Sequence, residues 1–198
     1  MALTRAMSVP APVAEEARIV AAMASRLCAA LASAETEPGL KSFLEKGRAE
    51  LARLSEDAAR DGAVGEDWIS VSGALCRAGE DLALAFGDMG NWAVEPEGGI
   101  LRLAELLREM LERMAAALAS SGASAQSGLA EAKGKGLELQ AVFRRARGAA
   151  LDSGKAVEGL KLCEVFRRFS DASAAADKAI ERLAWILAEG GRGGGSAH

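Results

Sequence analysis

Residues 155–189, KAVEGLKLCEVFRRFSDASAAADKAIERLAWILAE, decide the fold of this chain. Apolar and small side chains recur here at alternating steps of four and three residues, a spacing that aligns them along one side of an α-helix. They are Leu162, Phe166, Phe169, Ser173, Ala176, Ile180, Leu183 and Leu187. The opposite side carries the charged residues Lys161, Glu164, Arg167, Arg168, Asp171, Lys178 and Arg182. The pattern predicts one long amphipathic helix, which we expect to end at Gly190 and Gly191.

This helix is long enough to be the central element of a bundle. At about 1.5 Å per residue it extends over roughly 50 Å, more than a small domain needs for a single packing layer. Val165, Ala172, Ala179 and Ile186 widen its apolar side, which is typical of a helix that packs against more than one neighbour.

Composition favours an all-α fold. Half of the 198 residues are hydrophobic and many of these are alanine, whereas aromatic residues are scarce and tyrosine is absent. The formal net charge of −4 gives no electrostatic case for binding nucleic acid, because no basic surface would release phosphate counterions. The composition indicates a mildly acidic cytoplasmic protein.

Five further helices are predicted, over residues 13–34, 40–61, 66–89, 100–119 and 129–151. The first helix is expected to bury Ile19, Val20, Met23, Leu27 and Leu31. The fourth is expected to bury Leu103, Leu106, Leu107, Met110, Leu111, Met114 and Leu118. The fifth is expected to bury Leu137, Leu139, Val142, Phe143 and Ala146. We expect residues 91–99 and 120–128 to be loops. Short connections between consecutive helices predict a six-helix antiparallel bundle.

The chain divides into a lead of residues 1–12, one helical domain over 13–189, and a glycine-rich tail, 190–198, of flexible composition. The lead has one positive charge and no apolar segment, unlike a signal peptide. Residues 114–130 carry no charge, but their second half is too polar and too rich in glycine to span a bilayer. We expect no transmembrane helix, so that any membrane role goes through a partner.

The residues that usually carry enzyme chemistry are missing. Cys28, Cys76 and Cys163 are far apart and lack metal-ligand spacing, so we interpret them as core residues in a reducing compartment. His198 lies in the tail. There is no tyrosine, no glycine-rich phosphate loop after a strand and no nucleophile elbow. The sequence predicts a non-enzymatic protein without a cofactor.

Arginine supplies the candidate contacts for a ligand or partner. Arg144, Arg145 and Arg147 on the fifth helix, together with Arg167 and Arg168 on the last, could hold phosphate or an acidic partner surface. The alternative is that these arginines only decorate exposed helix surfaces.

Residues 159–177, GLKLCEVFRRFSDASAAAD, resemble the last-helix signature of PhoU-like phosphate-transport regulators, in the branch of Pit accessory proteins. Residues 65–69, GEDWI, are similar to the acidic entry into that branch's third helix, and the apolar run 100–111 lies where its fourth helix would be. The order and lengths of the six predicted helices agree with the family. The resemblance implies a PhoU-like fold and a regulatory role beside an inorganic phosphate transporter.

The same resemblance implies surface metal sites, built from carboxylates four residues apart on paired long helices. Here Ser170 and Ala174 stand where such a pair is expected, and Gln140 stands where the pattern has aspartate. Glu138, Glu164 and Asp171 remain as candidates for one weakly held cation. We therefore expect no tightly bound transition metal.

The sequence favours a cytoplasmic regulator or accessory protein of phosphate transport, peripheral to the inner membrane through a transporter or signalling partner. Two alternatives remain. One is a structural helical-bundle adaptor or homo-oligomer unrelated to phosphate. The other is a carboxylate-bridged metal protein, which the broken acid spacing and the lack of histidine in the helices disfavour.

Overall fold

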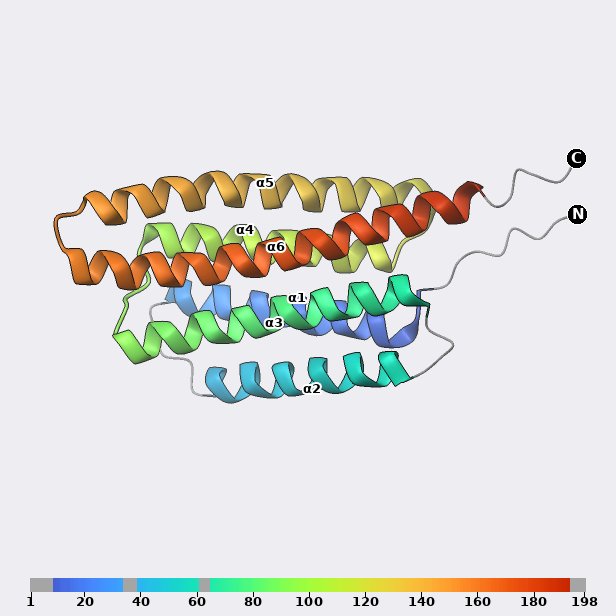
Figure 1. Ribbon diagram of the computed structural model, residues 1–198, viewed down its shortest axis with the longest axis horizontal. Helices are drawn as coiled ribbons and strands as arrows, with labels where there is room; N and C mark the ends of the chain where they lie inside the picture. The colour runs from blue at the N-terminus through green and yellow to red at the C-terminus, as the bar shows by residue number, and fades with distance from the viewer. Residues whose placement is uncertain (1–8, 34–38, 61–64, 193–198) are drawn as a thin grey trace, which may run out of the picture.

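The computed structural model describes residues 9–33, 39–60 and 65–192, and these residues form six α-helices and no strand (Figure 1). The helices are α1 (Ala11–Ser33), α2 (Leu40–Arg60), α3 (Glu66–Trp92), α4 (Gly98–Leu118), α5 (Gly122–Asp152) and α6 (Ala156–Arg192). Consecutive helices run in alternating directions (Figure 1). The prediction of an all-α helical bundle is confirmed. Within the described ranges, no helix combines the length and apolar character needed to cross a membrane.

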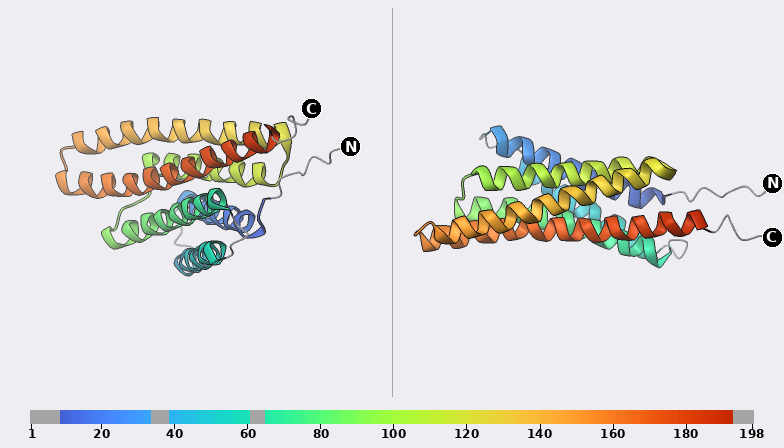
Figure 2. Two further views of the ribbon diagram at one scale, coloured as in Figure 1. Left: turned by 45° about the vertical axis from the view of Figure 1, so that its right-hand side comes forward. Right: turned by 90° about the horizontal axis from the view of Figure 1, so that it is seen from above.

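The bundle consists of two three-helix halves, α1–α3 and α4–α6 (Figures 1 and 2). Among the described residues, α2 contacts only α1 and α3, and α5 contacts only α4 and α6. The halves are joined where α3 packs against α6 and α1 packs against α4. Of all the helices, α6 is the longest, and it packs against α3, α4 and α5.

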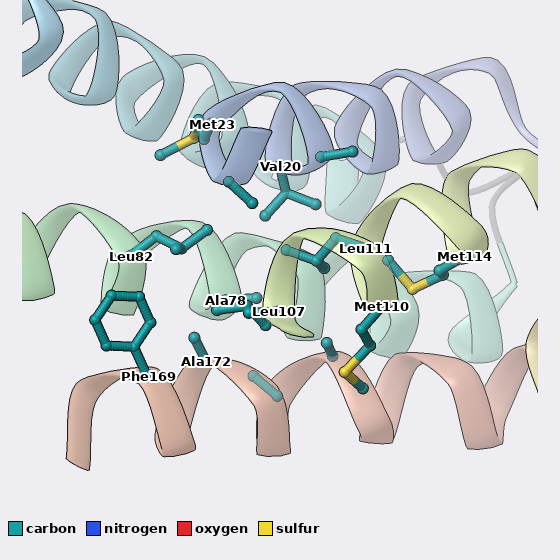
Figure 3. Close-up of a cluster of buried hydrophobic side chains, with 14 of the residues drawn as sticks. Val20, Met23, Ala78, Leu82, Leu107, Met110, Leu111, Met114, Phe169 and Ala172 are labelled. Atoms are coloured by element: carbon teal, nitrogen blue, oxygen red, sulfur yellow. The ribbon is translucent and has the colours of Figure 1, made fainter. Parts of the chain in front are cut away.

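One continuous hydrophobic core runs through both halves. On α6 the predicted apolar side is buried over most of its length, with Leu162 and Leu187 half-buried near its ends. On α4 the predicted residues Leu103, Leu106, Leu107, Met110, Leu111 and Met114 are fully buried. Figure 3 shows Phe169 beneath Leu82 of α3, so an α6 ring fills space at the joint between the halves.

The predicted loop at residues 120–128 is wrong from residue 122 onward, because α5 begins at Gly122. Ala125 and Leu129 in this segment are buried. A Cβ added at Gly128 would lie 3.0 Å from Ala117 Cβ of α4, so the small residues let the two helices approach closely. Tertiary packing thus outweighs the low helix propensity of glycine.

The predicted burial of Leu137 is also wrong, since this side chain is 67% exposed. The buried positions on α5 are Ala125, Leu129, Ala132, Gly136, Leu139 and Ala150. These follow the four-and-three spacing, and several are small. With only two neighbouring helices, α5 needs a narrow buried side, and Leu137 lies just outside it.

Several helix ends differ from prediction by two or three residues: α1 begins at Ala11 instead of Val13, and α4 begins at Gly98, within the predicted loop 91–99. α3 continues past Met89 to Trp92, where Ala93 adopts a left-handed φ of 51° and Val94 N–H donates to Met89 O over 2.9 Å. α6 continues through Gly190 and Gly191 to Arg192. Most of the predicted tail, residues 193–198, and the predicted lead over residues 1–8 lie outside the described residues.

Candidate functional site

A polar groove of about 530 Å³ lies between α3 and α6 on the joint between the two halves. Its lining comprises Ser70, Gly73, Ala74, Arg77 and Asp81 from α3, and Arg167, Arg168, Asp171, Ala174, Ala175 and Lys178 from α6. The uncharged lining residues are all small, so they leave space between the two helices while the charged side chains surround it. We call this feature the α3–α6 groove.

The α3–α6 groove is positively charged in a chain whose formal net charge is −4. Four basic side chains and two carboxylates line it. Arg77 and Lys178 are exposed, and within the described part of the chain neither has a carboxylate within salt-bridge distance of 4.0 Å. These two cations are available to a negatively charged group.

Arg167 is held on the surface of α6 by two carboxylates of its own helix. Its Nε donates to Glu164 Oε2 over 2.9 Å, and its Nη1 donates to Asp171 Oδ2 over 2.7 Å. The hydrogen bond from Arg167 lowers the pKa of Glu164. Because Arg167 and Asp171 are both more than two-fifths exposed, their ion pair contributes little to stability and exchanges readily.

Arg168, the next residue, makes contacts across the joint instead. Its Nε donates to Asp88 Oδ2 over 3.0 Å, and its Nη1 lies 3.8 Å from Asp81 Oδ1. Burial, followed by the nearby charge of Asp171, raises the pKa of Asp81, while Arg168 and Arg77 oppose that rise. Arg168 thus attaches α6 to α3 at one end of the groove.

The structure brings together only some of the predicted phosphate- or partner-binding arginines. Arg167 and Arg168 line the α3–α6 groove, whereas Arg144, Arg145 and Arg147 lie exposed on α5 and do not line it. Arg77 lines the groove but was not among the residues predicted to bind a ligand or partner. Its signal was the pairing of Arg77 and Asp81 at i and i+4, which places both on one side of α3.

The three candidate metal ligands do not converge. Glu164 and Asp171 both pair with Arg167, whereas Glu138 on α5 lies 3.4 Å from Lys135 and 3.7 Å from Arg102. In the part of the chain that the structure describes, no group of three or more histidine, cysteine, aspartate or glutamate residues could hold a metal ion.

The neighbouring hollow of about 310 Å³ between α5 and α6 is lined by one carboxylate, Asp177, and otherwise by uncharged residues. Gln140 Nε2 donates to Ser170 Oγ over 3.2 Å, at two of the three positions where the resemblance implies carboxylates. An amide and a hydroxyl bring no net charge to balance a cation.

Comparison with described protein families and with curated proteins finds no match to this chain. The α3–α6 groove presents fixed and available cations around a hydrophilic space, which suits the binding of a carboxylate or phosphate group.

Proposed function

We propose that this chain is a non-enzymatic, cytoplasmic accessory protein of inorganic phosphate transport, which regulates a transporter or signalling partner at the membrane by binding it. The phosphate-transport part of the proposal is supported by the PhoU-like resemblance of residues 159–177. The binding part is supported by the α3–α6 groove, where Arg77 and Lys178 are available cations.

The α3–α6 groove suits an acidic segment of a partner protein. A partner carboxylate would meet Arg77 and Lys178 from opposite helices, and it could replace Asp171 as the acceptor for Arg167. The exchange costs little, since the Arg167–Asp171 pair is exposed to water. No large apolar side chain lines the groove, so recognition would depend on charge and would weaken with salt.

The test is affinity purification from the native membrane fraction, with recovered proteins identified by mass spectrometry. The double variant Arg77→Gln/Lys178→Gln removes the two available cations. Lys41→Gln/Arg48→Gln is its matched control, because it removes the same charge from exposed positions on α2. We expect the wild type and the control to recover a phosphate transporter or its signalling partner, and the groove variant to recover at least tenfold less.

Two outcomes would contradict this proposal. Recovery of only further copies of the chain would favour the alternative, a homo-oligomer or structural adaptor unrelated to phosphate. Equal recovery with the groove variant and with its control would show that the partner binds elsewhere on the bundle.

A further inference from the structure

The turn between α5 and α6 extends beyond the ends of the other four helices (Figures 1 and 2). We define the hairpin tip as residues 144–161, which include the last turns of α5, the connection and the first turns of α6. The α3–α6 groove lies further along α6 and shares no residue with the tip.

Exposed apolar side chains gather at the hairpin tip. Leu151, Val157 and Leu160 are 54%, 63% and 64% exposed. They are three of the five large hydrophobic side chains that are exposed among the described residues. Single exposed hydrophobic residues are normal, but three within ten residues at a protruding end suggest a contact surface.

The hairpin tip is also basic, in contrast to the whole chain. Its basic residues are Arg144, Arg145, Arg147, Lys155 and Lys161, and its acidic residues are Asp152 and Glu158, an excess of three positive charges where the chain as a whole has a formal charge of −4. The three arginines are exposed on α5. Apolar side chains beside arginines are the combination that favours an anionic lipid surface.

The hairpin tip is preorganised rather than frayed. A Cβ added at Gly159 would lie 2.5 Å from the backbone oxygen of Ala150, so α5 and α6 approach closely there. Ser153 Oγ donates to the same oxygen over 2.8 Å, and Gly154 supplies the left-handed φ of 73° that the turn requires. The apolar side chains are therefore exposed by a packed turn.

We propose that the hairpin tip binds directly to the anionic surface of a phospholipid bilayer. Leu151, Val157 and Leu160 enter the boundary between headgroups and acyl chains, and the arginines of α5 bind lipid phosphates. This goes beyond the proposed function, in which the membrane is reached through a partner protein.

The size, shape and charge of the tip favour a bilayer over a protein partner. A typical protein–protein interface buries about 800 Å² on each side, whereas the tip offers three apolar side chains on a narrow convex end. Two copies in contact tip to tip would bring like charges together. A fluid bilayer accommodates a convex end without a complementary pocket.

The test is flotation of the full chain with vesicles of phosphatidylcholine alone or mixed with phosphatidylglycerol. We expect binding to the mixed vesicles only, with weaker binding as salt rises. The variant Arg144→Gln/Arg145→Gln/Arg147→Gln should bind about a hundredfold more weakly, at roughly fivefold per arginine. Its matched control is Lys41→Gln/Lys46→Gln/Arg48→Gln, which removes the same charge from exposed positions on α2 and should bind like the wild type.

Two further variants examine the apolar contribution. Leu151→Ser/Val157→Ser/Leu160→Ser should bind roughly tenfold or more weakly, whereas Leu137→Ser changes an exposed leucine outside the tip and should have no effect. In single variants, tryptophan fluorescence of Leu160→Trp should shift to the blue on addition of mixed vesicles, and that of Leu137→Trp should not. This readout does not depend on how well the triple variants fold.

The proposal is overturned if the wild type binds both vesicle types equally, binds neither, or binds only vesicles that contain a transporter. It is equally overturned if the tip variants bind like their controls. The groove variant Arg77→Gln/Lys178→Gln should float like the wild type, so failure of lipid binding is distinguishable from failure of the groove to bind a partner.

Discussion

The two three-helix halves bury different kinds of side chain. The α1–α3 half contributes three buried polar residues, Glu16, Ser72 and Asp81, each less than a tenth exposed. In the described part of the α4–α6 half, Ser173 is the one buried polar residue. The first half therefore contains ionisable groups whose burial costs free energy, while the second half is stabilised almost entirely by apolar packing. We expect the largest pH dependence of stability from Glu16 in α1–α3, and the largest dependence on side-chain volume from the apolar residues of α4–α6.

Glu16 is the clearest case. Ser72 Oγ donates to Glu16 Oε1 over 2.6 Å, but Glu16 Oε2 is buried without a hydrogen-bond partner among the described residues. Burial raises the pKa of Glu16 from 4.5 to about 7, and the Ser72 hydrogen bond opposes that rise. Cys76 lies one turn after Ser72 on α3. Burial, followed by the nearby charge of Glu16, raises the pKa of its thiol.

The largest expected effect on stability comes from Phe169 of α6, because its ring fills space at the joint between the two halves. Phe169→Ala should lower the free energy of unfolding by about 3–5 kcal/mol, because a fully buried ring leaves a cavity beneath Leu82. Urea unfolding followed by circular dichroism measures the loss. A loss of less than roughly 1 kcal/mol would mean that this side of α6 does not face the core.

The second-largest expected effect is the pH dependence of the free energy of unfolding that Glu16 gives to the α1–α3 half. The folded-state pKa of Glu16 lies above its ordinary value, so the folded protein binds more protons than the unfolded one between pH 4.5 and about 7. Its contribution to stability is present below pH 4.5 and is lost as pH rises to 7, by about 3 kcal/mol.

Glu16→Gln should remove most of this dependence and stabilise the protein above pH 7, as measured by urea unfolding at a series of pH values. The control Glu45→Gln alters an exposed glutamate on α2 and should leave the pH profile unchanged. A profile that stays the same in Glu16→Gln would assign the pH dependence to other groups.

The sequence predicts the apolar elements of this molecule well and its buried charge poorly. α4 follows a four-and-three pattern of large apolar residues and α6 one of apolar and small residues, and their buried sides match these patterns over most of each helix. Glu16 lies four residues before Val20 and seven before Met23, so periodicity does place it on the buried side of α1. Its charge conceals this, because a buried glutamate is uncommon.

The α3–α6 groove could be predicted only in part, because the two helices that form it are far apart in the sequence. The charged side of α6 indicates Arg167 and Arg168 directly. Nothing local indicates that Arg77 and Lys178 line one groove, since that depends on which helices become neighbours. The narrow buried side of α5 was not predicted, because several of its residues are alanine or glycine and these residues give a weak hydrophobic signal.

A smaller effect is expected from the ion pairs that connect the halves. Arg168→Gln should destabilise the fold by about 1–3 kcal/mol, because it leaves the mostly buried carboxylates Asp81 and Asp88 without their charged partner. Arg167→Gln is the matched control on the adjacent position. It breaks only exposed pairs within α6, so it should cost no more than about 1 kcal/mol. If urea unfolding shows equal losses of stability in the two variants, Arg168 does not connect the halves as described.

The smallest effect should come from Leu137, and it tests how narrow the buried side of α5 is. Leu137→Ala should change the free energy of unfolding by less than about 0.5 kcal/mol, because two thirds of this side chain already contacts water. Leu139→Ala, two residues along, should cost about 2–5 kcal/mol, since Leu139 is fully buried. Urea unfolding of both variants compares the same chemical change on the two sides of one helix. Similar losses at both positions would mean that α5 is rotated about its axis, and that the apolar packing of the second half extends further around α5 than its contacts with α4 and α6 indicate.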